Sequence, residues 1–293
     1  MKVYLTQFVK KITNPERNPR LFPSEQERCG AEQAVAEPVH AGSCAGARPE
    51  SFHLPVGRAK AHYVRSMFAC IASRYDLLNT ILSFNQHHAW RRLTVKLLRV
   101  QPGQLCLDVC TGTGDFAIEL ARATGAQGRV IGADFCEPMI RSGQSKVRRQ
   151  TGGVVRMTVA DAECLPYASG LFDVVTVGFG VRNVVDLEKA VAEMVRVVKP
   201  GGRVGILEFN RPPAVWYRPF VDFYLFQVLP RVGGLFGRRD AYTYLPESMK
   251  SFVSREELAA CMTRAGLDDI QIYDLNFGTV CIHTGVKRME PRL

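Results

Sequence analysis

The fold of this chain follows from one stretch, Leu105-Cys-Leu-Asp-Val-Cys-Thr-Gly-Thr-Gly-Asp-Phe-Ala117. Its apolar start predicts a buried strand, and its glycines predict a tight turn into a helix. Gly112 and Gly114 have no Cβ, so the backbone there can turn sharply and approach a ligand closely. Asp108 and Asp115 flank the turn, and two carboxylates would repel the pyrophosphate of a dinucleotide. They favour a cationic ligand, such as the ammonium and sulfonium groups of S-adenosylmethionine.

The glycine spacing by itself leaves two cofactor classes open. The pattern Gly112-x-Gly114-x-x-Ala117 also fits the fingerprint of nicotinamide-binding turns. A second strand is expected at Arg129–Asp134 and ends in an acid about 20 residues after the glycines, the usual place of a ribose-binding carboxylate. Both cofactor classes predict that acid, so only the later strands can distinguish between the two classes.

The remaining strands form an ordered set. Residues 154–161 are expected to form a third strand ending at Asp161-Ala162, where a carboxylate can accept from an adenine amino group and a backbone N–H can donate to a ring nitrogen. A fourth strand is expected at 171–177 and a fifth at 203–209, with a helix between them. This set resembles the class I S-adenosylmethionine-dependent methyltransferase fold, which is α/β and Rossmann-like. That resemblance implies a seven-stranded, mostly parallel sheet with helices on both faces.

The cofactor site is expected beyond the carboxyl ends of the strands, where the strand order switches. Two final strands, near 270–275 and 280–286, would complete the sheet. The alternative for Asp134 and Asp161 is that they only cap the helices after them. The residues assigned to the cofactor are Asp108, Gly112, Thr113, Gly114, Asp134, Asp161, Ala162 and Gly178.

Composition places only broad limits on the fold, the partners and the compartment of the protein. The chain has 293 residues, 46% of them apolar, which suits a domain with a buried core. Its net charge of +10 fits nucleic acid, an anionic membrane, an anionic small substrate or a solvated basic surface. No apolar run reaches the roughly 20 residues that span a bilayer. The nine cysteines form no zinc-ligand spacing, so no metal is expected, and Cys106, Cys110 and Cys281 are predicted to be buried thiols in a reducing cytosol.

The chain is expected to divide into an extension and one domain. Residues 1–55 lack periodicity and are rich in Pro, Glu, Arg, Gly and Ala, so we predict a flexible N-terminal extension. Residues 56–293 are predicted to form the methyltransferase domain. Within it, the aromatic-rich segment 211–245 is predicted to be a lid over an apolar substrate or a face that enters a membrane, with nearby arginines touching anionic lipid. An ordinary core helix at the sheet edge is the alternative.

Arg182 is the first candidate for catalysis. It follows the fourth strand in Gly178-Phe-Gly-Val-Arg-Asn183, at the mouth of the sheet. Its guanidinium has fixed donors that can bind an anionic substrate oxygen. The alternative is a surface arginine that pairs with Asp186 or Glu188.

Two further candidates precede the glycine turn. Tyr75 lies on an apolar helical stripe, so the alternative for it is a core tyrosine with a satisfied hydroxyl. His87 is a candidate base, although a lone histidine is more often structural than catalytic.

A set of short motifs goes beyond the general fold. They are Arg74-Tyr-Asp-Leu-Leu-Asn79, Leu82-Ser-Phe84, Trp90-Arg-Arg92, Thr111-Gly-Thr-Gly-Asp115, Phe179-Gly-Val-Arg-Asn183, Leu207-Glu-Phe209 and Tyr242-Thr-Tyr-Leu-Pro-Glu-Ser248. Together they resemble the ubiquinone/menaquinone biosynthesis C-methyltransferases, from about Ala59 to Lys287. The resemblance implies S-adenosylmethionine as cofactor and methylation of a ring carbon on a polyprenylated quinol, as from demethylmenaquinone to menaquinone. Asn85 stands where the family usually has glycine, and Gly178 where a small hydroxyl residue is common.

A ring carbon is a poor nucleophile until the quinol loses a phenolic proton. We therefore assign Arg182 to the developing phenolate and Tyr75, through a water, to the proton, with His87 as the other candidate base. One alternative is a small-molecule or nucleic-acid methyltransferase on the same fold. The latter usually carries Asn/Asp-Pro-Pro-Tyr after the fourth strand, where this chain has Gly-Phe-Gly-Val. A non-catalytic membrane-binding or assembly subunit is a further alternative, but it would tolerate loss of the cofactor acids, which are all present.

The expected partners are a polyprenylated demethylquinol and an anionic membrane, without nucleic acid, and a homodimer is a candidate oligomeric state. We expect the protein in the bacterial cytoplasm, peripheral to the inner face of the membrane, rather than in a mitochondrial matrix.

Overall fold

The computed structural model of the protein describes residues 55–210, 223, 244 and 247–289. The extension predicted for residues 1–55 lies outside these residues, apart from Pro55. The insertion predicted for residues 211–245 also lies outside them, apart from Phe223 and Tyr244.

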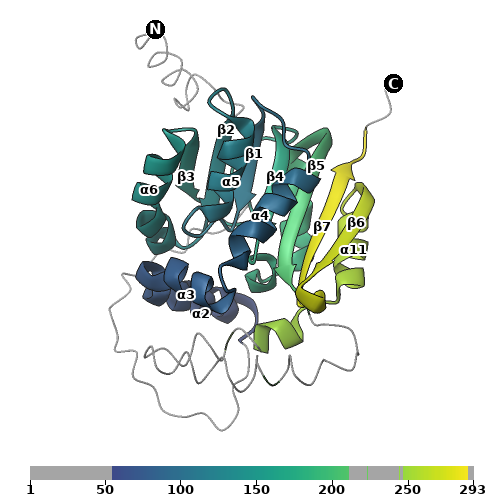
Figure 1. Ribbon diagram of the computed structural model, residues 1–293. Helices are drawn as coiled ribbons and strands as arrows, with labels where there is room; N and C mark the ends of the chain where they lie inside the picture. The colour runs from purple at the N-terminus through teal and green to yellow at the C-terminus, as the bar shows by residue number, and fades with distance from the viewer. Residues whose placement is uncertain (1–54, 211–222, 224–243, 245–246, 290–293) are drawn as a thin grey trace, which may run out of the picture.

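The described residues are organised around a seven-stranded sheet in the order β3-β2-β1-β4-β5-β7-β6 (Figure 1). Strands β1 to β6 all run in one direction, and β7, which lies between β5 and β6, runs antiparallel to both, which confirms the predicted mostly parallel sheet. The strand order reverses between β1 and β4, which is the point where open α/β sheets bind ligands. The strands are β1 Leu105–Val109, β2 Arg129–Asp134, β3 Val155–Val159, β4 Phe172–Gly178, β5 Val198–Phe209, β6 Leu267–Leu275 and β7 Val280–Lys287.

Strand composition follows position in the sheet. Phe172, Val174, Val175 and Val177 of the central strand β4 are fully buried, as expected for a parallel strand covered on both faces. The edge strand β6 is mostly exposed and carries polar residues. Some boundaries differ from the sequence prediction: β3 ends at Val159, before Asp161, and β6 begins at Leu267 rather than near residue 270. Strand β5 begins at Val198, and its pairing with β4 crosses an irregular step.

Helices cover both faces of the sheet. On one face, apolar side chains of α4, α5 and α6 pack with β1 and β4 in one core cluster. On the other, α7 and α11 pack with β4 and β5 in a second cluster. Figure 1 shows α4 and α5 in front of the sheet. These helices are α4 Gln86–Leu97, α5 Asp115–Thr124, α6 Glu137–Thr151, α7 Leu187–Val197 and α11 Arg255–Arg264.

The helices before the sheet lie beyond the carboxyl ends of its parallel strands (Figure 1). They are α2 Gly57–Ile71, the short 3₁₀ helix η2 Ala72–Arg74 and α3 Tyr75–Leu82. Asn85 is the N-cap residue just before α4 and has φ +63°, the left-handed conformation that glycine adopts freely and asparagine tolerates. The turn therefore keeps a glycine-like backbone although the residue differs from that usual in the family.

Candidate active site

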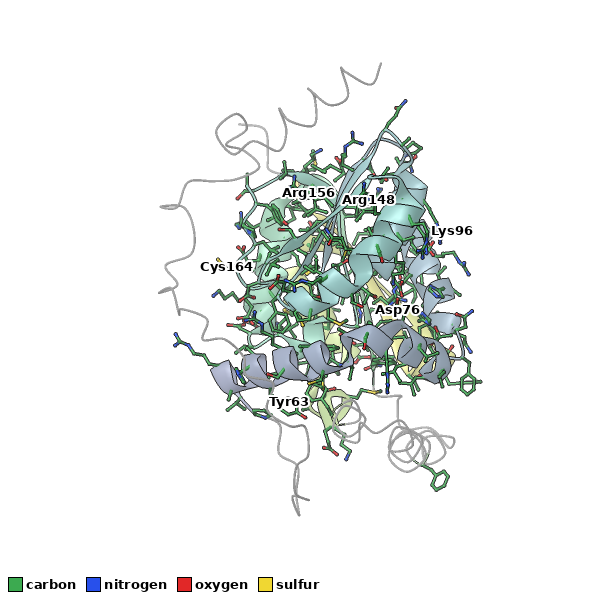
Figure 2. All side chains as sticks on the ribbon, turned by 90° about the vertical axis from the view of Figure 1, so that its left-hand side faces the viewer. Tyr63, Asp76, Lys96, Arg148, Arg156 and Cys164 are labelled. Carbon is green, nitrogen blue, oxygen red and sulfur yellow. The ribbon has the colours of Figure 1, made fainter. Side chains whose placement is uncertain are left out.

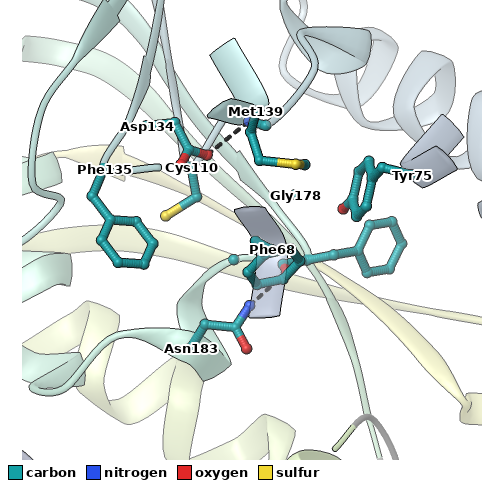
Figure 3. A pocket seen from close by; sticks show the side chains of 11 residues that line it. Phe68, Tyr75, Cys110, Asp134, Phe135, Met139, Gly178 and Asn183 are labelled. Carbon is teal, nitrogen blue, oxygen red and sulfur yellow. Dashed lines mark hydrogen bonds between the residues drawn. The ribbon is translucent and has the colours of Figure 1, made fainter. Parts of the chain in front are cut away.

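A pocket opens at the switch point, where the loops after β1, β2 and β4 meet α2 and α3. It holds about 370 Å³ of empty space, part of it open to solvent. Figure 3 shows Phe135 on one side of this pocket and Tyr75 on the other. The lining contains three of the predicted cofactor residues and one of the catalytic candidates. Its residues are Phe68, Tyr75, Cys110, Gly112, Asp134, Phe135, Met139, Gly178, Phe179, Gly180 and Asn183.

Asp134 is the carboxylate of the pocket. One of its oxygens accepts from the backbone N–H of Gly112 at 2.8 Å, and the other accepts from Cys136 N–H at 2.8 Å. Each carboxylate oxygen has a second acceptor direction, so Asp134 can still accept from ribose hydroxyls. Burial raises its pKa to about 6, which leaves it ionised at neutral pH. The predicted alternative for Asp134 is that it only caps the helix after it. Its carboxylate instead accepts from Cys136, the residue before α6, and not from the first turn of that helix.

The two aspartates that flank the glycine turn do not line the pocket. Asp108 is fully buried and accepts from the hydroxyls of Thr111 at 2.6 Å and Thr176 at 2.9 Å. Asp115 begins α5 and pairs with Lys146 at 2.7 Å. Both side chains already have partners inside the protein, and their attraction of a cationic ligand stays a prediction.

Asp108 gives a pH-dependent stability. Burial raises its pKa to about 7, above its value in the unfolded chain, so the stabilisation present at low pH is lost as the pH rises through 7. Asp108→Asn resembles the neutral form. We expect it to raise the melting temperature relative to wild type at pH 8 and to change it far less at pH 5, measured by differential scanning calorimetry without ligand. An equal shift at both pH values would contradict this, and Asp173→Asn, a partly exposed acid paired with Lys199, is the control.

Asp161 and Ala162 are the two residues predicted to bind adenine. Asp161 is exposed, and its carboxylate accepts from Glu163 N–H at 2.9 Å, while Ala162 is buried. No helix begins directly after Asp161 in the described chain, so the predicted alternative of a helix cap does not hold there. Neither residue is among those lining the pocket, and their contact with adenine stays a prediction.

Arg182 lies in the 3₁₀ helix η3 Val181–Asn183 and is almost completely buried. Its Nη1 donates to Glu208 at 2.6 Å and to the carbonyl of Phe179 at 2.7 Å. Its Nε is buried and has no hydrogen-bond partner among the described residues. The predicted surface pairs are absent, because Asp186 caps α7 through Lys189 N–H and Glu188 pairs with Arg264. The partner Glu208 could have been suspected as the one acid in the apolar end of β5.

Asn183 connects two of the sequence motifs. The hydroxyl of Tyr244 donates to the side-chain oxygen of Asn183 at 2.8 Å, and the amide of Asn183 donates to the carbonyl of Phe179 at 3.3 Å. Tyr244 is buried, and its ring lies 5.7 Å from that of Tyr63. Tyr244 of the second motif therefore contacts Asn183 of the first, a residue that lines the pocket, although the two are far apart in the chain.

Tyr75 and His87 lie in different places. Tyr75 faces the pocket close to Gly112, and burial raises its pKa. His87 is buried, is hydrogen-bonded to Ser83 at 2.6 Å and lies 3.9 Å from Asp115. It is not among the pocket-lining residues. Burial and the nearby Arg91 lower its pKa to about 4, so it is neutral at physiological pH.

The structure also shows how the remaining predicted residues are packed. Thr113 is buried, with its hydroxyl turned to Asp76 rather than into the pocket. A side chain at Gly178 would meet the ring of Phe116 at 2.8 Å, so a larger residue requires that ring to move. Cys106 and Cys281 are buried as predicted, whereas Cys110 is only partly buried and lines the pocket. No helix in the described ranges is long and apolar enough to cross a bilayer.

The residues present fit S-adenosylmethionine. Gly112 brings a backbone without a side chain to the pocket, and Asp134 offers acceptors for the ribose. Phe68, Tyr75 and Phe135 supply aromatic faces, which attract cations such as a sulfonium. Fold and pocket together define the class of the protein: it is a class I methyltransferase whose cofactor is S-adenosylmethionine.

Sequence comparison gives the family. The chain belongs to the ubiE/COQ5 methyltransferase family, which matches residues 56–287. It is 44% identical to the ubiquinone/menaquinone biosynthesis C-methyltransferase UbiE of Geobacter sulfurreducens, over 79% of this chain and 91% of that protein. It is 39% identical to the demethylmenaquinone methyltransferase of Bacillus cereus strain B4264, over 78% of this chain and 98% of that protein. The family predicted from the motifs is thereby confirmed.

Solved structures agree with the fold. A SAM-dependent methyltransferase from Thermotoga maritima is similar with a TM-score of 0.53 and 19% identity, covering 76% of this chain and 99% of that one. Another from Aquifex aeolicus has a TM-score of 0.50 and 19% identity, covering 67% and 88%. The predicted fold class is therefore confirmed as well.

Proposed function

We propose that this enzyme methylates a ring carbon of a polyprenylated demethylquinol. The reaction belongs to menaquinone biosynthesis, where demethylmenaquinol becomes menaquinol, to ubiquinone biosynthesis, or to both pathways. The observation that carries the proposal is the match over most of the chain to relatives named for these reactions. The pocket supports it, because aromatic side chains line it next to a buried arginine. Such a pocket suits a planar ring that carries an oxygen which becomes an anion.

When bound, S-adenosylmethionine supplies an electrophilic methyl group on its sulfonium. The chain must then stabilise the phenolate oxygen of the quinol and accept its proton. Arg182 has a buried Nε without a partner among the described residues, a donor that a phenolate oxygen can use. Glu208 and the carbonyl of Phe179 hold the same guanidinium through Nη1, so its orientation is set before substrate binds.

We assign the proton to Tyr75, through a water, rather than to His87. Tyr75 lines the pocket, whereas His87 is enclosed behind the glycine turn and hydrogen-bonded to Ser83. The raised pKa of Tyr75 keeps its hydroxyl protonated at neutral pH, so it can relay a proton by accepting one as it gives one up.

The test is the quinone pool of a bacterium whose own quinone C-methyltransferase has been deleted. Mass spectrometry of its membranes should show a quinone that is one methyl group lighter, and expression of this chain should restore the full mass. An empty vector is the control. A quinone pool unaffected by expression would overturn the proposal and favour the alternative of a methyltransferase for other small molecules or nucleic acid.

The proposal includes peripheral contact with the cytoplasmic face of an anionic membrane, since a polyprenyl tail stays in the bilayer while the ring enters the pocket. Leu77, Ile81 and Phe84 are 56%, 39% and 74% exposed, and steps of four and three place them on one side of α3 and its following turn. Arg74 is exposed three residues before this stripe and can meet anionic headgroups. The helix that carries Tyr75 thus offers an apolar outer side to lipid.

Replacing Leu77, Ile81 and Phe84 together by serine should weaken binding to vesicles of anionic lipid by at least about tenfold, because each loses apolar area that lipid would bury. Vesicle sedimentation measures the partition coefficient. Ile272→Ser, at an exposed apolar position on the edge strand β6, is the matched control. Equal losses in both variants would count against α3 as the contact. A homodimer stays a prediction that gel filtration can address.

A further inference from the structure

We propose that Asp76 and Lys146 form a latch that fixes α3 to the glycine turn and thereby positions Tyr75 over the pocket. The latch consists of Asp76, Thr113, Asp115 and Lys146. The proposal rests on the proposed function, because the role of Tyr75 belongs to it. Asp76 and Lys146 are positioning residues: neither lines the pocket, and both act through Tyr75.

Lys146 is the centre of the latch. Its Nζ donates to Asp76 at 2.6 Å, to Asp115 at 2.7 Å and to the hydroxyl of Thr113 at 3.1 Å. The Thr113 hydroxyl in turn donates to the other carboxylate oxygen of Asp76 at 2.6 Å. One ammonium on α6 therefore joins α3 to the glycine turn and the adjoining start of α5.

Lys146 and Asp115 are largely sheltered from solvent, whereas the side chain of Asp76 is 46% exposed, and Arg91 balances the second carboxylate. The side chains of Lys146 and Asp115 are 17% and 10% exposed, and Arg91 of α4 lies 3.7 Å from Asp115 on its other side. Burial alone would raise the pKa of Asp115, but Arg91 and Lys146 outweigh it and lower that pKa. Loss of Lys146 would leave Asp76 and Asp115 without the charge between them, so the network depends on this one ammonium.

α6 approaches the turn closely enough for this contact because of Gly143. A Cβ there would lie 2.2 Å from the carbonyl oxygen of Thr113, so the helix lies directly on the backbone of the turn. Lys146 is three residues further along and projects from the same side of α6. The close approach of the two backbones at Gly143 thus places the ammonium of Lys146 within hydrogen-bond distance of Thr113.

The latch has a consequence for the pocket because Asp76 adjoins Tyr75. Among the residues that the structure describes, the polar side-chain bonds from α3 to the turn and to α6 run through Asp76. The other polar ties of the N-terminal helices hold α2 and η2, through Lys60 to the carbonyl of Val184 and through Ser142 to that of Ala72. Of these polar contacts, only those of the latch hold the first turn of α3, which carries Tyr75.

The first test separates catalysis from cofactor binding. Asp76→Asn keeps an oxygen that accepts from Thr113 but loses the ion pair with Lys146. We expect kcat for demethylquinol to fall at least about tenfold, since small misplacements of a reacting group cost that much or more. The dissociation constant of S-adenosylmethionine, measured by calorimetry, should stay within about threefold. Arg141→Met removes an exposed ion pair with Glu137 on the same helix and should change neither value.

The second test asks whether the latch acts through Tyr75. In a Tyr75→Phe background, Asp76→Asn should lower kcat no further, and Lys146→Arg should retain more activity than Lys146→Met. A further tenfold fall in the Tyr75→Phe background would overturn the proposal, as would an Asp76→Asn variant with wild-type kcat.

The third test needs no substrate. Hydrogen exchange of α3 should speed up at least about tenfold in Asp76→Asn, while that of β4 stays unchanged. Unchanged exchange in α3 would overturn the latch. Absence of methylated product from the wild-type enzyme would instead overturn the proposed function, so the two failures are distinguishable.

Discussion

Arg182→Met is expected to lower quinol methylation by at least about 100-fold, because a donor to a developing oxyanion contributes about that much to turnover. Binding of S-adenosylmethionine should change little, since the hydrogen bonds of Arg182 go to Glu208 and to the carbonyl of Phe179, and not to Gly112 or Asp134. The single variant also leaves Glu208 buried and unpaired, which costs about 3–5 kcal/mol of folding stability. A fall in activity could therefore come from unfolding.

A double variant separates these effects. In Arg182→Met/Glu208→Gln the buried charge is gone, and the amide oxygen can still accept from the backbone N–H of Phe209, as the carboxylate does at 2.8 Å. Most of the lost stability should return, as measured by urea unfolding, while turnover stays at least about 100-fold down. Recovery of turnover together with stability would remove Arg182 from the mechanism and leave it a structural role.

Gly143→Ala is expected to destabilise the protein by about 2–3 kcal/mol, although alanine is the better helix former by about 1 kcal/mol. The added Cβ would lie 2.2 Å from the oxygen and 2.6 Å from the carbonyl carbon of Thr113, and these are backbone atoms that cannot rotate away. Because the turn must shift, we also expect S-adenosylmethionine to bind at least about tenfold more weakly.

Ser145→Ala is the matched control, since Ser145 is exposed two residues further along the same helix. It should stabilise slightly or not at all. Urea unfolding and calorimetry measure both variants. If Gly143→Ala behaved like Ser145→Ala, α6 would not rest on the glycine turn in solution.

The fold could be predicted because its signals are local. Alternating apolar segments and glycine turns identified each strand and helix of the sheet, and the ordered acids at strand ends indicated the cofactor class. The predicted strand boundaries were wrong where pairing with a neighbouring strand extends the element. The sequence Lys199-Pro-Gly-Gly202 looks like a turn, yet β5 begins at Val198 and pairs with β4 across an irregular step.

The site was less predictable because its contacts join distant residues. Asp115 looked like a ligand for a cation, and only the folded chain shows that Lys146 occupies that role. Phe68 and Met139 look like core residues in the sequence, and nothing in their pattern indicates that they line a pocket. Arg182 follows β4 as the sequence indicates, but its partner Glu208 lies on β5, and the sequence gives no sign that the two meet.

The reversal of strand order between β1 and β4 has a consequence for the diversification of such enzymes. Gly112, Asp134 and Met139 come from the half of the chain before β4, whereas Phe179, Asn183 and the Arg182–Glu208 pair come from the half after it begins. Most of the proposed cofactor residues thus come from the first half and the Arg182–Glu208 pair comes from the second, while Tyr75 and Gly178 cross this division. A chimera joined before β4 would exchange the Arg182–Glu208 pair and keep Gly112 and Asp134. Engineering of a new methyl acceptor would therefore also have to adapt Tyr75 and the end of β4 at Gly178.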